Sequence, residues 1–366
     1  LAVIDPHGDL AERLVAQIPN DRRAKLHYLN APDPGQPYGY NPLRGVRADR
    51  VPLAASGLLE AFQMLWPEAW GVRMEHVFRN TLYALIEAGN GTLADIGRML
   101  SEPVFRAGVL KRVRNRQVLS FWLGEFPHYN PRYRQETIAP IQNKAGQLLL
   151  SPVIRNIIGQ VRSKVSIPFV MNEGRIFLAN LSKGEIGHDK ANLLGSLLIT
   201  QFQLAAMARN RQPEEERRDF FLFVDEFQNF ATESFTSILA EARKYRLNLT
   251  LSHQYIAQLS PTVREAVFGN VGTLVAFRVG FADAEHLHGE FGEEFHQRQF
   301  VDLPRYETLI RNQSASGSIH FQRTRLSPPI ETHQGRKDKL LRRSRQRFAT
   351  PRAEVEEKLK RWLRQL

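Results

Sequence analysis

The chain has 366 residues, more than one average domain, so we expect two domains or one domain with a large insertion. An apolar content of 42% supports a hydrophobic core, and no apolar run approaches the roughly 18 residues of a membrane span. The absence of cysteine excludes disulfides, iron–sulfur clusters and thiolate zinc, and the formal charge of +12 favours a polyanionic partner, chiefly nucleic acid or an anionic membrane surface.

The opening residues predict the beginning of a sheet. Residues 1–4 fit a buried strand, 10–18 a helix and 25–30 a second strand. Since no leader precedes the first strand, we expect an N-terminally truncated fragment. Asp5 follows this strand, and its place at a carboxyl end makes it a candidate for cofactor binding. The Pro- and Gly-rich stretch 31–42 predicts a loop or domain boundary.

Residues 44–160 have a different character. Apolar side chains recur there at helical spacing, and strand signals are nearly absent. Arg73, His76 and Asn80 share one polar side that suits contact with a nucleotide or nucleic acid, although a solvated helix face fits the same pattern. The segment predicts an all-helical insertion or lid domain.

Sheet signals return at residue 167. Residues 167–171 and 175–181 flank Asn172-Glu173-Gly174 and predict a β-hairpin. Lys183, in the loop that follows, is suited to approach phosphate or DNA, and a flexible turn is an equal alternative. The remaining pattern alternates strands at 220–225, 247–252 and 272–279 with helices at 189–208, 233–245 and 261–268. This alternation predicts crossover units and a mostly parallel sheet.

An apolar run that ends in two acids marks the candidate catalytic strand. Phe220 to Val224 is too short for a helix and fits a strand buried on both faces. Asp225 and Glu226 follow at its carboxyl end, where open α/β sheets bind ligands. In P-loop NTPases an Asp at this Walker B position helps to hold Mg²⁺ on the nucleotide, and an adjacent Glu suits polarisation of the attacking water. A solvated acidic turn fits the same residues.

Three further residues are candidates for action on a phosphoryl group. Gln254 would emerge beside the two acids if its strand is their neighbour, and its amide suits a γ-phosphate sensor or a loop cap. Arg243 ends the intervening helix, where it either complements the helix macrodipole or acts as an arginine finger toward a neighbouring subunit. Arg278 ends the strand 272–279 and competes for the finger role, for which we favour Arg243.

The final segment is basic, and residues 331–366 carry a net charge of +7. Its polar, Ser- and Arg-rich composition predicts loose order between 310 and 351, followed by an amphipathic helix at 353–366 that could dock on its own domain or on a partner. Contacts with DNA phosphates would give salt-sensitive binding with little sequence preference. The candidate contacts are Arg342, Arg343, Arg345 and Arg347.

One motif of a P-loop enzyme is missing. The phosphate cradle needs Gly-x-x-x-x-Gly-Lys-Ser/Thr, and no Gly-Lys pair occurs in this sequence. We therefore expect the first strand and the Walker A loop to lie upstream of residue 1. No Gly-x-Ser-x-Gly elbow and no cluster with metal-ligand spacing supports another chemistry.

Taken together, the segments resemble the HerA/FtsK branch of the P-loop ATPases, and within it the type IV secretion coupling proteins of conjugation. The resemblance spans nearly the whole chain, and the order and spacing of its motifs are more specific than any one motif. The most specific parts are residues 4–8, 41–43, 70–75, 181–196, 224–228, 241–245 and 252–255.

The resemblance implies a RecA-like α/β motor domain with a mostly parallel sheet, in two parts at 1–43 and 161–310. An all-α domain is inserted at 44–160, and 311–366 is a basic tail. Such motors are homo-hexameric rings that use ATP and Mg²⁺ to move DNA. In this chain Asp225 would hold Mg²⁺, Glu226 would activate water, Gln254 would sense the γ-phosphate and Arg243 would act in trans.

The resemblance also implies a biological setting. The motor would pass DNA from a relaxase to the secretion channel, in the cytoplasm at the inner-membrane face, tethered only through a missing N-terminal segment. Without a Walker A loop, we expect this fragment alone to be inactive as an ATPase. Two alternatives stay open: a HerA-type translocase in DNA-end processing, and a non-catalytic nucleic-acid- or partner-binding module that has lost its P-loop.

Overall fold

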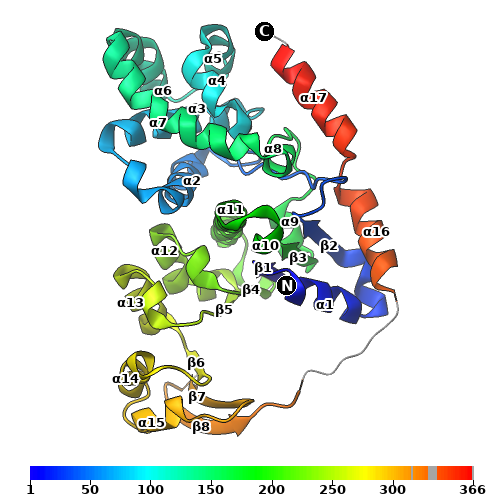
Figure 1. The fold of residues 1–366 in the computed structure, drawn as a ribbon, viewed down its shortest axis with the longest axis vertical. Helices are drawn as coiled ribbons and strands as arrows, with labels where there is room; N and C mark the ends of the chain where they lie inside the picture. The colour runs from blue at the N-terminus through cyan, green and yellow to red at the C-terminus, as the bar shows by residue number, and fades with distance from the viewer. Residues whose placement is uncertain (315, 329–335, 365–366) are drawn as a thin grey trace.

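The computed structural model describes residues 1–314, 316–328 and 336–364. Figure 1 shows three tiers: a helical region at the top, a five-stranded sheet in the middle, and a small sheet at the bottom. The central sheet has the order β2 (Leu26–Asn30), β3 (Ile176–Asn180), β1 (Ala2–Asp5), β4 (Phe220–Val224), β5 (Leu247–Leu251). Every pair in it is parallel, which confirms the predicted α/β class with a mostly parallel sheet.

One long helix, α11 (His188–Ala208), covers one face of this sheet. Its Phe202 packs between Phe177 of β3 and Phe220 of β4, with ring centroids 5.8 and 5.7 Å away. In the described part of the chain this helix alone is long and apolar enough to cross a membrane, but 83% of its apolar window is buried inside the protein, as in a core helix.

The other face of the sheet is covered only in part. Helices α1 (Asp9–Gln17) and α16 (Lys337–Phe348) pack there on β1, β2 and β3. Over β4, Phe221 and Phe223 stay 49% and 37% exposed. The prediction that this strand is buried on both faces is therefore wrong for one face, because no described helix covers it.

The helical region confirms the predicted change of character. Its helices are α2 (Val51–Leu65), α3 (Val72–Ala88), α4 (Ile96–Ser101), α5 (Pro103–Leu110), α6 (Arg116–Ser120), α7 (Pro131–Leu150) and α8 (Pro152–Ile158). It rests on the central sheet layer through α2, which packs against α11. Gly57 permits the close approach, since a Cβ there would lie 2.6 Å from Cγ2 of Thr200.

The predicted hairpin at 167–181 is half wrong. Only its second half is a strand, β3, and the first half is the helix α9 (Ile167–Asn172). The Ser166 hydroxyl accepts a hydrogen bond from the Phe169 N–H, and Pro168 occupies the first turn, where a proline fits a helix. Val170 and Met171 of α9 are fully buried, so tertiary packing overrides their strand propensity.

The third tier differs from the prediction. Strands β6 (Thr273–Ala276), β7 (Glu307–Gln313) and β8 (Ile319–Arg325) form a separate antiparallel sheet with its own apolar core, so 272–279 does not extend the parallel sheet. The predicted boundary at 310 falls inside β7. For the described residues, the loose order expected between 310 and 351 is contradicted by the β7–β8 pairing and by α16 (Lys337–Phe348), while residues 315 and 329–335 lie outside the described part. The helices of this half are α10 (Lys183–Ile186), α12 (Glu233–Glu241), α13 (Pro261–Asn270), α14 (Phe281–Glu290) and α15 (Gln297–Val301).

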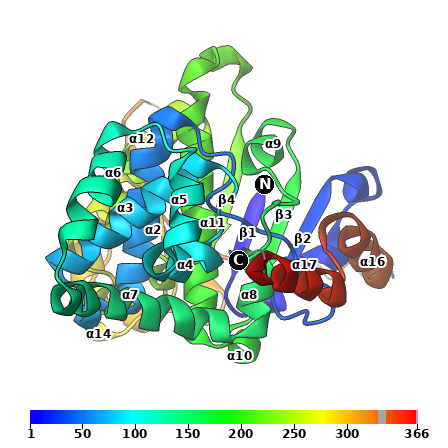
Figure 2. The same ribbon diagram turned by 90° about the horizontal axis from the view of Figure 1, so that it is seen from above.

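The C-terminal tail connects two tiers. In α16 the Ser344 hydroxyl accepts a hydrogen bond from the Tyr28 N–H at 2.9 Å, and the Phe348 ring stacks on His27 of β2. Helix α17 (Arg352–Arg364) then climbs beside α8 to the helical region (Figures 1 and 2). There Trp362 Nε1 donates to Oδ1 of buried Asp95 at 2.7 Å. The terminal helix thus docks on its own chain.

Candidate nucleotide-binding site

Four parallel strands bring polar side chains to one edge of the central sheet. Because the carboxyl ends of parallel strands share an edge, residues distant in sequence meet there. They are Asp5 at the end of β1 and His7 after it, Lys183 after β3, Asp225 and Glu226 after β4, and Ser252 and Gln254 after β5. We use the name acid cluster for Asp225, Glu226 and the side chains that contact them, which are His7, Lys183, Asn229, Ser252 and Gln254.

Glu226 is the centre of the acid cluster. Its Oε1 lies 2.7 Å from His7 Nε2 and accepts a hydrogen bond from Gln254 Nε2 at 2.7 Å. Its Oε2 lies 2.5 Å from Lys183 Nζ and accepts from Asn229 Nδ2 at 2.9 Å. The carboxylate is 6% exposed at the residue level and fully hydrogen-bonded, so its position is fixed before any ligand arrives.

The electrostatics keep this carboxylate ionised. Burial alone would raise the pKa of Glu226, but hydrogen bonds and positive charge from Lys183 and His7 outweigh it and lower the pKa to about 2. A carboxylate that is charged at neutral pH can accept a hydrogen bond from a water molecule and orient it. The group therefore has the charge state that the predicted role requires.

The backbone conformation at Glu226 determines the direction of its side chain. Glu226 adopts a left-handed conformation with φ of 44°, which is uncommon for a residue with a Cβ and is often found at functional sites. Phe230, in the turn that follows, is fully buried against α11, and a Cβ on Gly195 would lie 2.2 Å from its ring. Glycine at 195 thus lets the long helix approach the turn that carries Glu226.

Asp225 is the half-exposed member of the pair. Its Oδ1 accepts a hydrogen bond from the Ser252 hydroxyl at 2.6 Å, and its Oδ2 has no partner in the described residues. A carboxylate and a hydroxyl are oxygen donors of the kind that Mg²⁺ prefers, and this ion usually takes its other ligands from water and phosphate. Asp225 and Ser252 are therefore suited to a nucleotide-bound Mg²⁺.

Asp5 has a different role from the predicted one. It is fully buried, and its two carboxylate oxygens accept hydrogen bonds from the backbone N–H groups of His7 and Ala11 at 2.9 and 2.8 Å. Both oxygens are therefore used inside the protein. Asp5 shapes the turn that presents His7 and the first turn of α1, and it does not face a ligand.

Lys183, which the sequence suggests as a DNA contact, lies inside the acid cluster, where its amine is paired with Glu226. Arg243 is exposed and precedes β5, whereas Gln254 follows that strand. At a rise of roughly 3.3 Å per residue, β5 separates Arg243 from the acid cluster by about 16 Å. Arg278 is exposed next to β6, in the small sheet. Neither arginine contacts the acid cluster of its own chain in the described residues.

The four tail arginines fall into two pairs. Arg345 makes an ion pair with Asp33 at 2.7 Å, and Arg347 donates to the Ala24 carbonyl, so both hold α16 to the segments that flank β2. Arg342 and Arg343 are exposed, and no ion pair with them occurs among the described residues. Only this second pair is free to meet a phosphate backbone.

Sequence reasoning missed part of the acid cluster. His7, Ser252 and Asn229 are not among the candidate site residues that the sequence suggests, and Lys183 is suggested there as a contact for phosphate or DNA. Their positions in the sequence have one feature in common: each lies one to three residues after the end of a parallel strand or after the acid pair. These positions predict contacts only when the order of the strands in the sheet is known.

No protein-family model matches the chain, and no curated protein sequence does either. Solved structures do match. The plasmid coupling protein TrwB, in complex with the GTP analogue GDPNP, superposes with a TM-score of 0.61 at 14% identity, over 91% of this chain and 80% of that one. Unbound conjugative coupling protein TrwBdeltaN70 gives 0.59 at 12% identity, over 91% and 79%. VirB4 of Thermoanaerobacter pseudethanolicus gives 0.55 at 16% identity, over 90% and 81%.

These similarities establish the class of fold. The chain has the RecA-like fold of the type IV secretion coupling proteins and of VirB4, as its motifs predict. TrwB has also been solved in complex with an ATP analogue, ADPNP. At 12–16% identity the comparison carries the fold, and the function of this chain rests on its own residues.

Proposed function

We propose that the chain is the core of an ATP-driven motor that moves DNA for a type IV secretion system. One observation carries the proposal: an ionised Glu226, held by Gln254 and Lys183, stands beside the half-free carboxylate of Asp225 at the carboxyl edge of a parallel sheet. Bound ATP would supply the phosphoryl group and Mg²⁺ the charge that neutralises its oxygens. Asp225 would hold the ion, and Glu226 would orient the water.

The phosphate cradle must come from another segment, because the sequence has no Gly-Lys pair. The sheet offers a place for it. β5 is an edge strand of the described sheet, and Phe221 and Phe223 lie exposed next to it. We propose that a further strand pairs with β5 and that its helix covers these two rings, so that the phosphate loop between them reaches the acid cluster.

Arg243 would then serve a neighbouring copy. Its own acid cluster is out of reach along β5, and a guanidinium supplied in trans stabilises charge on the transferred phosphoryl group. This role needs an oligomer, and we propose a homo-hexameric ring around DNA, with Arg278 as the second candidate.

The DNA part of the proposal rests on exposed tail arginines. Removing two phosphate contacts should weaken DNA binding equally for all sequences and lower the slope of log K against log salt by about 2. We expect this for the double variant Arg342→Ala/Arg343→Ala in a filter-binding series. Arg345→Ala is the matched control. It should lower the thermal stability because it breaks the ion pair with Asp33, and it should change the DNA affinity less than the double variant does.

The motor is tested with a chain that includes the coding sequence upstream of Leu1. We expect ATP hydrolysis that is stimulated by DNA, together with displacement of a third strand from a triplex on a linear duplex. DNA binding with no hydrolysis by the longer chain would contradict the proposal and favour a non-catalytic binding module. Hydrolysis without strand displacement would contradict the translocation step alone.

A further inference from the structure

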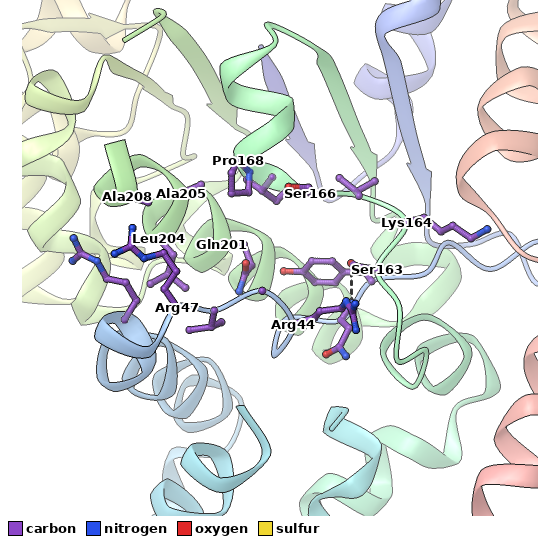
Figure 3. Close-up of a pocket in the computed structure, with 17 residues that line it drawn as sticks. Arg44, Arg47, Ser163, Lys164, Ser166, Pro168, Gln201, Leu204, Ala205 and Ala208 are labelled. Carbon is purple, nitrogen blue, oxygen red and sulfur yellow. Dashed lines mark hydrogen bonds between the residues drawn. The ribbon is translucent and has the colours of Figure 1, made fainter. Parts of the chain in front are cut away.

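A cavity of about 350 Å³ lies between the helical region and the motor. Figure 3 shows its walls: the linker that follows β2, with Arg44 and Arg47, the segment that leads into α9, and the last turns of α11. The cavity is remote from the acid cluster. Helix α11 begins shortly after Lys183 and ends at the cavity, and its 21 residues span about 30 Å.

The cavity is lined by cations and by no carboxylate. Arg44, Arg47, Arg50 and Lys164 are among its 17 lining residues, and none of the 17 is Asp or Glu. Its volume falls within the range of roughly 300–1,000 Å³ that is typical of small-molecule sites. Positive charge gathered in a concave site favours an anionic ligand.

The positive charge is only partly neutralised by the protein. Asp49, beside the cavity, is shared by three guanidinium groups: it lies 2.9 Å from Arg47, 3.4 Å from Arg211 and 3.8 Å from Arg50. One carboxylate thus serves three arginines. Arg44 adds a further charge, with no ion pair among the described residues.

Arg50 also has an unused donor. Its Nη2 donates to the Met207 carbonyl at 3.2 Å, and its buried Nε makes no hydrogen bond, because Oδ2 of Asp49, its ion-pair partner, lies 3.8 Å away. A buried donor without an acceptor destabilises the protein. A phosphate oxygen is an acceptor that matches the planar fork of a guanidinium.

Part of the remaining wall is apolar. Leu204, Ala205 and Ala208 of α11, together with Val46 and Pro168, contribute apolar lining, and Ser163, Ser166 and Gln201 add polar groups. We propose that this cavity binds a nucleotide-sized phosphate ester, with its phosphate on Arg44 and Arg50 and its base or sugar against the apolar wall. Such a ligand would connect the linker to α11 and so hold the helical region against the motor. The site would be separate from the acid cluster and independent of the function proposed for it.

The test uses this chain with AMP and inorganic pyrophosphate as probes in calorimetric titrations. We expect AMP to bind, pyrophosphate to compete with it, and Arg44→Ala/Arg50→Gln to weaken binding by about 10-fold or more, on the scale of lost charge-assisted hydrogen bonds. Arg162→Ala removes the same charge from an exposed residue that does not line the cavity, and it should leave binding unchanged.

Three results would overturn the proposal. They are no binding of either probe at millimolar concentration, loss of AMP binding in Glu226→Gln but not in the arginine variant, and binding of single-stranded oligothymidylate through Arg44 and Arg50 in preference to AMP. The second would place the nucleotide in the acid cluster, and the third would make the cavity part of a DNA track. If the double variant does not fold, Arg44→Glu alone, in the exposed linker, gives the same readout.

Discussion

The two faces of the five-stranded sheet differ in how completely helices cover strand β4. On one face Phe220 lies under α11 with 1% of its surface exposed, and Phe202 stacks on it. On the other face its neighbour Phe221 is 49% exposed. α1 and α16 cover β1, β2 and β3 on that side and stop before β4.

The difference has a functional meaning. The uncovered half of the sheet adjoins both the edge strand β5 and the acid cluster. A large exposed apolar area beside polar chemistry usually marks an interaction site. The α11 face is a buried core, whereas the β4–β5 side is where we propose that another element packs.

The largest effect should come from the buried face. Phe202→Ala removes a fully buried ring between Phe177 and Phe220, and we expect a loss of about 3–5 kcal/mol in the free energy of unfolding. Urea denaturation followed by circular dichroism measures it. A loss below about 1 kcal/mol would show that the α11 face is not the main core.

A smaller effect is expected where the tail docks. Trp362→Phe keeps an aromatic ring beside Arg98 but removes the N–H that donates to buried Asp95, at a cost of about 1 kcal/mol. Hydrogen exchange should then rise in α17 and stay unchanged in α16, which has its own contacts with β2. Lys360→Ala, on the exposed side of α17, is the control. An equal rise in hydrogen exchange in α16 and α17 would contradict the inference that the two helices dock independently.

The tail also predicts a pH dependence. Burial, and then the charges of Arg175 and Arg347, lower the pKa of His27 from 6.5 to about 4. The unfolded chain therefore binds more protons between these two values. Stability from neutral His27 is complete above pH 6.5 and is lost as the pH falls toward 4. His27→Phe, which retains the stacking on Phe348, should reduce this loss between pH 7.5 and pH 5 in denaturation experiments. An identical pH profile in both proteins would exclude His27.

The smallest effect is expected on the open face. Phe221→Ser and Phe223→Ser should each change the free energy of unfolding of this chain by no more than about 0.5 kcal/mol, because the rings are already exposed. In a longer chain that carries the phosphate-loop segment, the same changes should destabilise by more than about 1 kcal/mol. Equal effects in both chains would mean that nothing covers this face.

The sequence predicted what depends on local pattern and missed what depends on neighbours. The apolar run before Asp225 predicts a strand with acids at its carboxyl end. The position of Gln254 after the next strand predicts that it lies beside those acids. The exposure of Phe223 could not be foreseen, because an apolar run does not tell which helices lie above it. Asp5 looked like a ligand residue by position alone, and only its two backbone N–H partners reveal a structural role.

Composition misled in two places. Ile167, Phe169 and Val170 are good strand formers. Ser166 and Pro168 nevertheless start a helix there, and these two residues are the signal in the sequence that indicates it. The polar residues of β7 and β8 suggested loose order, but the strands pair over seven residues and pack Leu309 against the core of the small sheet.

The most direct measurement compares steady-state ATP hydrolysis by this chain, by the longer chain that includes the upstream coding sequence, and by the longer chain with Glu226→Gln. We predict negligible hydrolysis by the first, DNA-stimulated hydrolysis by the second, and a rate lower by roughly 10²–10⁴-fold in the third, with nucleotide binding retained. Robust hydrolysis by the present chain that depends on Glu226, or an unchanged rate in the variant, would show that the acid cluster is not the water-activating half of a nucleotide site.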